Sequence, residues 1–475
     1  RSLLERARRR ALAVARRQVE PVDLGVFGAF LRRWQHADPR DVQTGMAGVE
    51  AVLRQLGGLA RPPERWERDY LPARLESYDA AWLSQLAATG QLAWSGSARA
   101  DVEAPSPVLS AIRFYPRGEG GIWLPQEAGS SPSADAQRVI EELSRSGASF
   151  FPDLQAATGL AAAALREALR ELVALGLATN DTVEAMREVA RTRALPVRER
   201  DEADDATRWL PAEFTPSLGR PIVQRRPSAH RLPRWRRPDL PAPASGWVGR
   251  WSLLRREQSG QLSEDRHAEL VARRWLDRYG VVTSDWWKRE RPAIGWRAIY
   301  RELKRLEFQG DVRRGYFVQG LAGAQFALPA AVELLRGVRD EGDDAPTVVL
   351  AASDPANPFA LPLAARGRTP LENPRGSGSL LVLRGPRVLM SAESMGRRVT
   401  VRADATDVDV TAAARALASY VSRRRGATAD RARARIIVER IDGLAAGASS
   451  WSAAFAAAGF RRVTRGFEFD PLGRR

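Results

Sequence analysis

Basic and aromatic side chains gather in one stretch of the chain, between residues 286 and 314. Apolar Ile299, Leu303 and Leu306 recur there at helical spacing, which predicts a helix over residues 295–309 with one buried face. The cations of this helix fall within an arc of about 100° on the opposite face, with no acid among them. Such a face suits the phosphates that line a nucleic-acid groove. Its members are Arg297, Arg301, Lys304 and Arg305.

The segments on either side of this helix add to the pattern. A short helix is expected before it, over residues 283–291, and the strand of a hairpin after it, from residue 311. Aromatic rings interleaved with arginines stack unpaired bases while they neutralise the backbone. A solvated helix face, with either tryptophan in the core, is the alternative interpretation. The flanking candidates are Trp286, Trp287, Lys288, Arg289, Arg313 and Arg314.

A second helix of the same kind is expected over residues 161–175, but its charges differ. Leu165, Leu169 and Leu172 face inward. The outer face mixes arginines with glutamates at spacings that pair within the helix. We interpret this helix as structural or as an oligomer contact.

Groups that could perform catalysis are sparse. Asp354 follows an expected strand and precedes Pro355, so it is either the acceptor of an Asx-turn or a catalytic carboxylate, and Asp470 is a weaker candidate. The chain has no cysteine, and its three histidines are isolated, so we expect no metal site. No G-x-x-x-x-G-K-[ST] phosphate loop occurs, which excludes ATP hydrolysis by that motif within this chain.

Charge and hydropathy point to the class of partner. The 475 residues include 74 basic and 57 acidic side chains, a net charge of +17. This balance favours a polyanion such as DNA, RNA or an anionic lipid surface. No apolar run reaches about 18 residues, so no transmembrane helix and no membrane partner are expected.

Helices followed by paired strands recur along the chain, which predicts an α+β protein of tandem winged-helix modules. Strand-like runs from residue 347 predict a small C-terminal β-rich, barrel-like unit. We expect a helical segment with a winged-helix module at 1–125, a winged helix at 126–190, a Pro/Arg-rich linker packing on its neighbours at 191–262, a winged helix at 263–344, and the β-rich unit with terminal helices at 345–475. Residues 191–245 are expected to form a long linker that packs on neighbouring modules rather than a domain, and residues 1–20 to form a helix. The chain begins without methionine, and we expect it to be part of a longer protein.

Six stretches carry a family resemblance. They occur in the family's order over nearly the whole chain: FGAFLRRWQ at 27–35, LPARLESYDAAWLSQLAATGQLAWSG at 71–96, GRWSLL at 249–254, RRGYFVQGLAGAQFALPAAVELLR at 313–336, SDPANPF at 353–359 and GFRRVTRGFEF at 459–469. Together they resemble the C-terminal, non-ATPase region of the large helicase-related (Lhr) family of bacterial DNA helicases. The resemblance implies a parent ATP-dependent 3′-to-5′ DNA repair helicase.

The resemblance also implies partners and cofactors. Single-stranded DNA, duplex DNA or an RNA–DNA hybrid would be bound, and the region would assemble with itself, with a tetramer expected. The parent's N-terminal helicase core would hold ATP and Mg, leaving this chain without a cofactor and non-catalytic alone. The protein would act in the bacterial cytoplasm, at the nucleoid.

Two other functions stay open. The arrangement is also similar to AlkZ-type DNA glycosylases, which would remove uracil or an alkylated base with a carboxylate such as Asp354 in a cleft. Those enzymes carry a Q-x-Q or Q-x-D motif, whereas Gln35 and Asp38 here are one residue too far apart. The other alternative is a pure oligomerisation scaffold.

Overall fold

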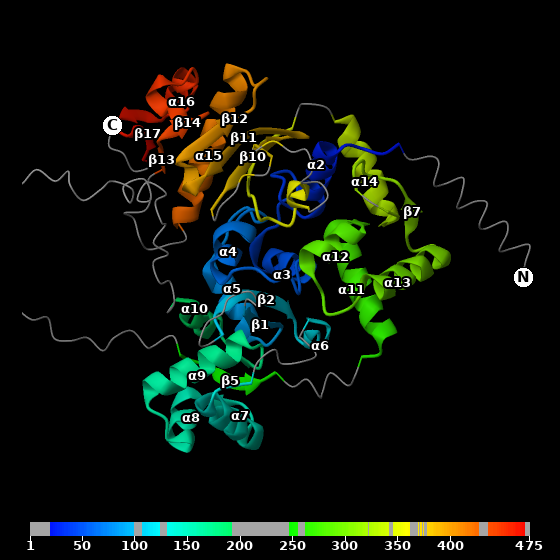
Figure 1. Ribbon diagram of the computed structural model, residues 1–475, viewed down its shortest axis with the longest axis vertical. Helices are drawn as coiled ribbons and strands as arrows, with labels where there is room; N and C mark the ends of the chain where they lie inside the picture. Colours follow the sequence, from blue (N-terminus) through cyan, green and yellow to red (C-terminus); the bar gives the residue numbers. More distant parts are fainter. Residues whose placement is uncertain are drawn as a thin grey trace, which may run out of the picture.

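The computed structural model describes residues 20–98, 107–123, 131–191, 247–254, 262–321, 323–341, 345–361, 369, 371–372, 374, 378–426 and 436–470. The helix expected over 1–20 and the linker over 191–245 lie outside them, apart from residues 20 and 191. The described part contains helices and several separate sheets, which confirms the α+β class and the winged-helix architecture (Figure 1). Within the described residues, no helix combines the length and apolar character needed to cross a bilayer.

The first module places four helical segments before a two-stranded wing. These elements are α2 (Leu24–Trp34), α3 (Gly45–Gln55), α4 (Pro63–Arg65) continued by the π-helical turn η1 (Trp66–Tyr70), α5 (Ala80–Ala88), and strands β1 (Leu92–Ala98) and β2 (Leu109–Pro116), followed by the short α6 (Gly120–Trp123). The wing strands pair antiparallel from Leu92–Pro116 to Ala98–Leu109.

The second module draws its sheet from both sides of a long sequence gap. It comprises α7 (Ala134–Ser146), β3 (Ser149–Phe150), α8 (Phe151–Thr158), α9 (Ala162–Ala174), β4 (Ala178–Asn180), α10 (Val183–Arg191) and β5 (Arg250–Leu253). Strand β5 lies between β3 and β4 and pairs with both. The expected linker over 191–262 is therefore wrong for residues 250–253. Pairing between strands some 70 residues apart leaves no local signal in the sequence.

The last module has the most regular winged-helix order. Its elements are α11 (Glu264–Tyr279), β6 (Val281–Val282), α12 (Ser284–Glu290), α13 (Trp296–Gln309), β7 (Arg313–Gly315), β8 (Gln325–Ala327) and α14 (Pro329–Asp340). Strand β8 lies between β6 and β7. Helix α11 begins where the Ser263 hydroxyl accepts a hydrogen bond from the Arg266 amide, with Glu264 and Asp265 in its first turn, and it ends at Gly280.

The C-terminal unit is β-rich, as expected, and its main sheet is open rather than barrel-like in the described residues. Strands β9 (Thr347–Ala351), β10 (Leu380–Arg384), β11 (Arg387–Glu393), β12 (Arg398–Val401), β14 (Arg440–Ile441) and β15 (Leu444–Ala445) form one sheet in the order β15-β14-β12-β11-β10-β9, whose two edge strands do not pair. Helix α15 (Asp407–Gly426) packs on β9, β10 and β11. Strands β13 (Ile436–Val438), β16 (Arg461–Val463) and β17 (Gly466–Phe469), with α16 (Ser452–Ala457), form a separate small sheet.

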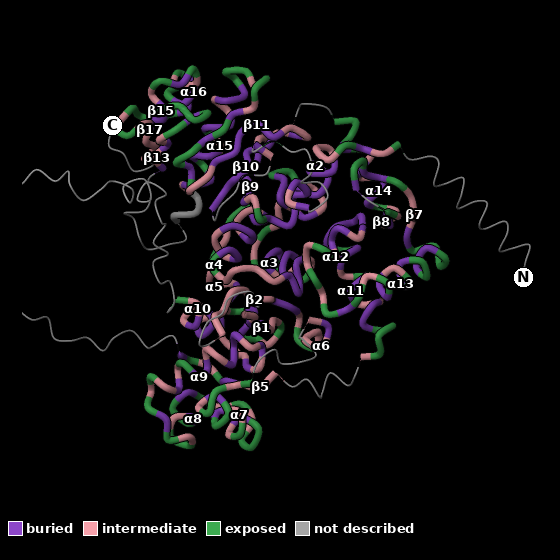
Figure 2. The backbone as a smooth tube through the Cα atoms, viewed as in Figure 1, coloured by how far each residue is buried: buried purple, intermediate pink, exposed green. Residues whose placement is uncertain are grey.

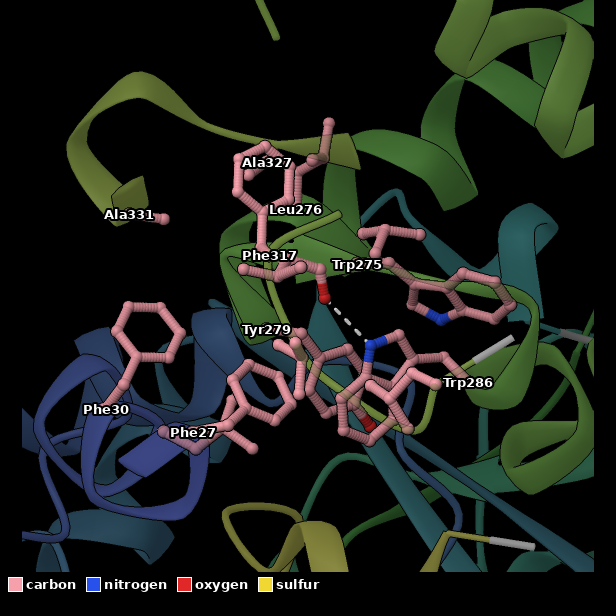
Figure 3. Close-up of a cluster of buried hydrophobic side chains, with 14 of the residues drawn as sticks. Phe27, Phe30, Trp275, Leu276, Tyr279, Trp286, Phe317, Ala327 and Ala331 are labelled. Atoms are coloured by element: carbon pink, nitrogen blue, oxygen red, sulfur yellow. Dashed lines mark hydrogen bonds between the residues drawn. The ribbon is translucent and has the colours of Figure 1, made fainter. Parts of the chain in front are cut away.

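Cores cross the module boundaries. One core joins the first and second modules, and another joins α2, the last module and the start of the C-terminal unit. In the latter, Trp286 stacks on Tyr279 with centroids 3.7 Å apart, and Phe27 of α2 packs beside it (Figure 3). Helix α2 therefore belongs in packing terms with residues 263–390 more than with the helices that follow it.

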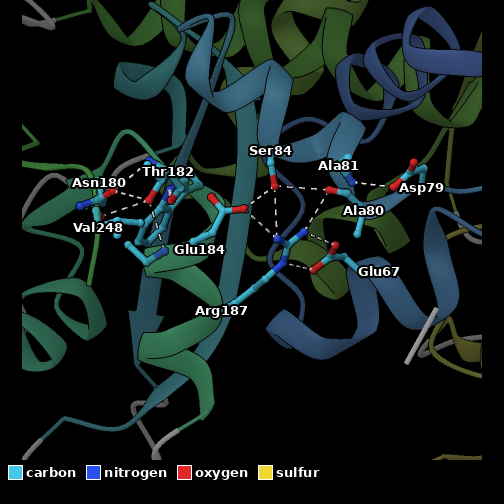
Figure 4. A network of polar contacts seen from close by, with 12 residues as sticks. Glu67, Asp79, Ala80, Ala81, Ser84, Asn180, Thr182, Glu184, Arg187 and Val248 are labelled. Carbon is cyan, nitrogen blue, oxygen red and sulfur yellow. Dashed lines mark hydrogen bonds and ion pairs between the residues drawn. The ribbon is translucent and has the colours of Figure 1, made fainter. Parts of the chain in front are cut away.

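Polar contacts reinforce the joint between the first two modules (Figure 4). Arg187 of α10 donates to both oxygens of Glu67 in η1, at 2.6 and 2.9 Å, and to the Ser84 hydroxyl of α5. Tyr78 donates to the same Glu67 carboxylate. Burial raises the pKa of the Tyr78 hydroxyl, and the Glu67 charge raises it further. The phenol therefore remains a neutral donor at neutral pH.

The first module is fixed to the C-terminal unit by a buried ion pair. The Arg74 guanidinium donates to both oxygens of Asp354, at 2.7 and 3.0 Å, and both side chains are almost completely excluded from solvent. Arg74 also donates to Gln35 Oε1, and the Ala356 amide donates to Asp354. The carboxylate thus joins α2, the segment after η1 and the loop after β9.

Removing one partner of this pair would leave the other charge buried and uncompensated. We expect Asp354→Asn to lower the free energy of unfolding by roughly 3–5 kcal/mol. The double variant Arg74→Gln/Asp354→Asn should lose less than the sum of the two single losses, since the two groups interact directly. Urea denaturation of the wild type, the two single variants and the double variant measures these losses of stability. If the loss in the double variant equalled the sum of the single losses, a direct ion pair would be contradicted.

A second buried pair sits at the end of α12. Arg278 donates to both oxygens of Glu290 at 2.6 Å, and Tyr279 and Trp275 donate to the same carboxylate. Burial alone would raise the pKa of Glu290, but the charge and hydrogen bonds of Arg278 outweigh it, so the pKa is lowered. A depressed carboxyl pKa stabilises the fold above the unfolded value of about 4.3, and this stabilisation is lost as pH falls through the folded pKa.

Glu290→Gln tests this pH dependence. We expect the variant to be destabilised at pH 7 by roughly 3 kcal/mol, because Arg278 stays buried without its counter-charge. Between pH 5 and pH 3 it should lose less stability than the wild type, since the titrating group is gone. Denaturant unfolding at each pH is the measurement, with exposed Glu264→Gln as the control. Equal pH slopes for wild type and Glu290→Gln would disprove the assignment.

Candidate nucleic-acid interface

Helix α13 occupies the position before the wing of the last module and presents one face to solvent (Figures 1 and 2). Ile299, Leu303 and Leu306 are fully buried, as their spacing predicts. Gly310 ends the helix in a left-handed conformation, φ 92°, which glycine adopts without strain. The remaining face carries the cations.

Three cations of α13 are available to a ligand. Arg297 and Lys304 are exposed and, within the described residues, have no ion-pair partner. Arg301 is also exposed and lies 3.5 and 3.6 Å from carboxylates of Asp265 and Glu264 at the start of α11. Two acids of α13 itself, Glu302 and Glu307, are buried and do not join this face. The exposed face of α13 is therefore positively charged, although the acids at the start of α11 partly neutralise Arg301.

Arg305 is less available than its position in the sequence indicates. Its guanidinium contacts the Glu302 carboxylate at 2.6 Å and that of Glu269 at 3.4 Å. The hydrogen bonds that Arg305 donates to the Glu302 carboxylate raise the pKa of Arg305. A phosphate would have to compete with two carboxylates, so Arg305 lies at the margin of the interface.

The wing adds weaker cations and exposed rings. Arg313 lies 3.5 Å from Glu333, and Arg314 lies 3.4 Å from Glu307. The Tyr316 side chain beyond β7 is 48% exposed, and its hydroxyl accepts a hydrogen bond from the Gly320 amide. Phe308 of α13 is 53% exposed. It was missed in the sequence, although its i,i+4 spacing from Lys304 places it on the basic face.

The two tryptophans of α12 lie inward. Trp286 is fully buried and donates to the Val281 carbonyl (Figure 3), so the prediction that it contacts nucleic acid is wrong. Trp287 is half-buried and donates to the Ile294 carbonyl. The stacking of Trp286 on Tyr279 holds the seven-residue helix α12 against α11. Burying an aromatic ring in this way is more favourable than exposing it to solvent.

The two cations of α12, Lys288 and Arg289, point in different directions. Lys288 is exposed and lies 3.4 Å from Asp285. Arg289 points into the molecule, where it donates to the Asp354 and Asn357 carbonyls and stacks over Trp286. Arg289 is therefore not part of the α13 face. The reduced interface comprises Arg297, Arg301 and Lys304, with Lys288, Arg305, Arg313 and Arg314 around them.

The structure does not prepare Asp354 for catalysis. Arg74 and the Ala356 amide occupy its carboxylate, and the latter contact is the Asx-turn that the sequence predicts. Asp470 is half-buried after β17, which belongs to another sheet. Gln35 is also used structurally, accepting from Arg74 and donating to the Arg278 carbonyl. The described residues contain no cluster of acids and histidines suited to a metal ion.

The corresponding helices of the other modules differ from α13. Helix α9 packs on the wing of the first module, where a side chain at Gly96 would lie 2.4 Å from the Val173 carbonyl. Its Arg170 pairs with Glu167 and stacks over Trp247, while Arg166 stacks over Phe151. Helix α5 contains no lysine or arginine. Among these three helices, α13 alone has exposed cations without ion partners.

Two regions match a known family of domains. Residues 22–117 and 261–347 match the third and fourth winged-helix domains of the large helicase-related protein. The matches coincide with the first and last modules, and the second of them contains the whole basic face of α13.

Curated relatives extend the similarity beyond these two domains. The chain is 33% identical over 457 residues, 93% of its length, to an Lhr helicase/probable uracil glycosylase of Mycolicibacterium smegmatis. It is 28% identical over 424 residues, 84% of its length, to an Lhr helicase/uracil glycosylase of Escherichia coli. The chain spans 27% and 26% of those two proteins, about a quarter of each.

A solved structure is more distantly similar. The Streptomyces sahachiroi DNA glycosylase AlkZ aligns with 84% of this chain and 97% of its own, at 13% identity and a TM-score of 0.42. That likeness is too weak to support a shared activity. The two domain matches and the full-length relatives agree, and the chain therefore belongs to the large helicase-related family, with two of that family's winged-helix domains at residues 22–117 and 261–347.

Proposed function

We propose that this chain is the nucleic-acid-binding, non-ATPase region of an Lhr-type 3′-to-5′ DNA repair helicase. The observation that carries the proposal is the exposed face of α13, where Arg297 and Lys304 have no ion-pair partner within the described residues. Cations on the exposed helix of a winged-helix module bind the phosphates of a groove and displace its counterions.

Exposed aromatic rings on α13 and beyond strand β7 give this interface a second mode of contact. Exposed Phe308 and Tyr316 lie next to cations, and such rings stack bases in single strands. Single-stranded DNA is accordingly the first ligand to test, with duplex DNA and RNA–DNA hybrids beside it. In this proposal ATP and Mg bind the parent's helicase core, which contacts this chain, and the protein acts at the bacterial nucleoid.

Assembly with itself is a further part of the proposal. The second module carries exposed apolar Phe150 in strand β3 and Val248 before strand β5, and its helix α9 is occupied by intramolecular packing. That module is thus better suited to protein contact than to nucleic acid. Light scattering on the wild type and on Phe150→Ser tests this part of the proposal, because it distinguishes a tetramer from a monomer.

The binding proposal is tested by titrating single-stranded DNA across salt. We expect Arg297→Ala/Arg301→Ala/Lys304→Ala to weaken binding at least tenfold at low salt and to reduce the slope of log K against log salt by about 2. The matched control is Arg138→Ala/Arg145→Ala/Arg191→Ala, which removes three exposed cations of the second module. If both triple variants bound single-stranded DNA with equal affinity, the α13 face would not be the binding site. Binding would then depend only on overall charge, or the chain would serve only as a scaffold.

Uracil excision is the second candidate function, because the names of both relatives include uracil glycosylase. The occupied carboxylate of Asp354 argues against it as the catalytic group, which leaves Asp470. Uracil release by the wild type, abolished in Asp470→Asn with unchanged thermal unfolding, would establish this activity. We expect no release above a blank, consistent with a non-catalytic region.

A further inference from the structure

One face of the six-stranded sheet is covered over only part of its width. Thr400 of β12 lies opposite Ser391 of β11. Ser391 lies opposite Leu381 of β10, which lies opposite Leu350 of β9, so the four side chains share one face. Leu381 and Leu350 belong to the core that α2 shares with the last module, whereas Thr400 is exposed. The face that packs on α2 therefore opens to solvent at β12, on the side of the sheet away from β9 (Figure 1).

The exposed part of this face carries two neighbouring cations. Arg398 of β12 and Arg440 of β14 are partners in a parallel pair of strands, so their side chains leave the sheet on the same face. The next partners, Val399 and Ile441, are buried on the opposite face. Arg398 is two residues from Thr400 and hence on the side of that hydroxyl. Arg398 and Arg440 are both exposed, so two guanidinium groups extend from adjacent positions into solvent.

The two guanidinium groups differ in their partners. Arg398 Nη2 lies 3.2 Å from Glu393 Oε2, which belongs to β11, on the side of β12 away from β14. Arg440 donates to the Gly443 carbonyl at 3.1 Å and pairs with no carboxylate among the described residues. Like charges directly opposite each other on neighbouring strands destabilise a sheet. An anion bound to both arginines would remove that repulsion.

A third arginine lies beyond β15. Ala445 of β15 is the register partner of Arg440, and Gly447 follows in the 3₁₀ helix η5 (Ala446–Ala448). Arg462 of β16 donates through Nη2 to the Gly447 carbonyl at 3.3 Å and is exposed. Ala445 and Gly447 thus connect Arg440 with Arg462, and neither has a large side chain. Arg398, Arg440 and Arg462 are here called the sheet arginine row.

The exposed charge around the sheet arginine row is mainly positive. Over residues 396–402 and 436–469, each of which the structure describes, the one exposed acid is Asp442. Its oxygens accept hydrogen bonds from the Val401 amide and the Trp451 indole. Asp404, just beyond β12, binds Arg402. Such an excess of exposed cations attracts a polyanion. The exposed arginines of these two segments are Arg397, Arg398, Arg440, Arg461, Arg462 and Arg465.

We propose that the sheet arginine row, with the Thr400 hydroxyl beside it, binds phosphates of the nucleic-acid strand that contacts α13. Guanidinium groups and hydroxyls are frequent partners of phosphate oxygens, and such contacts carry no sequence information. The row rests on the proposed nucleic-acid function, to which it adds a second contact. It lies on the sheet face that packs on α2 and, through their shared core, on the last module.

The length of the strand tests the row. An oligothymidylate of about 8 nucleotides, near the site size of one module, is compared with one of about 40. We expect Arg398→Gln/Arg440→Gln/Arg462→Gln to bind the long strand about tenfold more weakly than the wild type, with a salt slope lower by about 2. The short strand should be bound equally by both proteins. Arg138→Gln/Arg145→Gln/Arg191→Gln, which removes three exposed arginines of the second module, should match the wild type at both lengths.

The α13 triple variant separates failure of the row from failure of the proposed function. We expect it to weaken binding of both strands. If it does so while the row variant binds the long strand as the wild type does, the row is overturned and the α13 interface stands. If only the row variant loses affinity, the row stands and the α13 interface fails. If the wild type binds neither strand, both are overturned.

Arg440→Glu distinguishes contact with a ligand from support of the fold. A carboxylate at this position would lie opposite Arg398 and replace the repulsion by attraction, so we expect the midpoint of thermal unfolding to rise by about 1 °C. Affinity for the long strand should nevertheless fall further than in Arg440→Gln. Arg138→Glu makes the same change of charge on the second module and should leave this affinity unaltered. A lower midpoint with unchanged affinity would assign Arg440 to the fold and overturn the row.

Discussion

The Arg74–Asp354 ion pair is the contact on which the relative placement of the modules depends. Its two residues are 280 positions apart and almost wholly excluded from solvent. Gln35 binds the same guanidinium, and Arg289 binds the backbone carbonyl of Asp354. The end of α2, the segment after η1, α12 and the loop after β9 therefore meet at this ion pair and at the backbone carbonyl of Asp354. Because a buried charge without its partner is costly, this arrangement favours a single docking geometry over alternatives.

This constraint explains why so many arginines of the chain do not act on a ligand. Arg74 and Arg187 each bind a carboxylate of another module, while Arg278 binds Glu290 within the last module and donates to the Gly57 carbonyl of the first. The guanidinium group suits that role because its planar fork donates to both oxygens of a carboxylate at once. The net charge of +17 thus overstates the cations available to a polyanion. On α13, by contrast, Arg297 and Lys304 are exposed and have no ion-pair partner among the described residues.

The three modules before the C-terminal unit differ in what their helices pack against. Helix α9 is buried against the first wing and α5 has no cations, whereas α13 faces solvent. Under the proposed function, α13 would contact nucleic acid while the other two helices hold the modules together. The chain represents about a quarter of its curated relatives, in which the same modules would be joined to further domains.

Much of the local structure and the family were predictable from the sequence. Helical spacing predicted the buried leucines of α13 and α9, the Asx-turn at Asp354 was predicted from SDPANPF, and six motifs indicated the Lhr family. These features depend on neighbours within a few residues, so local patterns carry them. The pairing of β5 with β3 and β4, and the open C-terminal sheet, depend on long-range register and were not predictable.

The sequence by itself determined which residues carry charge and which helix faces are apolar. Tertiary structure alone decided whether each charge is free. Arg289 and Trp286 lie in the same basic and aromatic segment as Lys288, yet packing on Tyr279 and on the loop after β9 turned them inward. Acids of α11 approach Arg301 from another helix. Electrostatic neutralisation acts through space, and a linear pattern contains no distances between segments that meet only on folding.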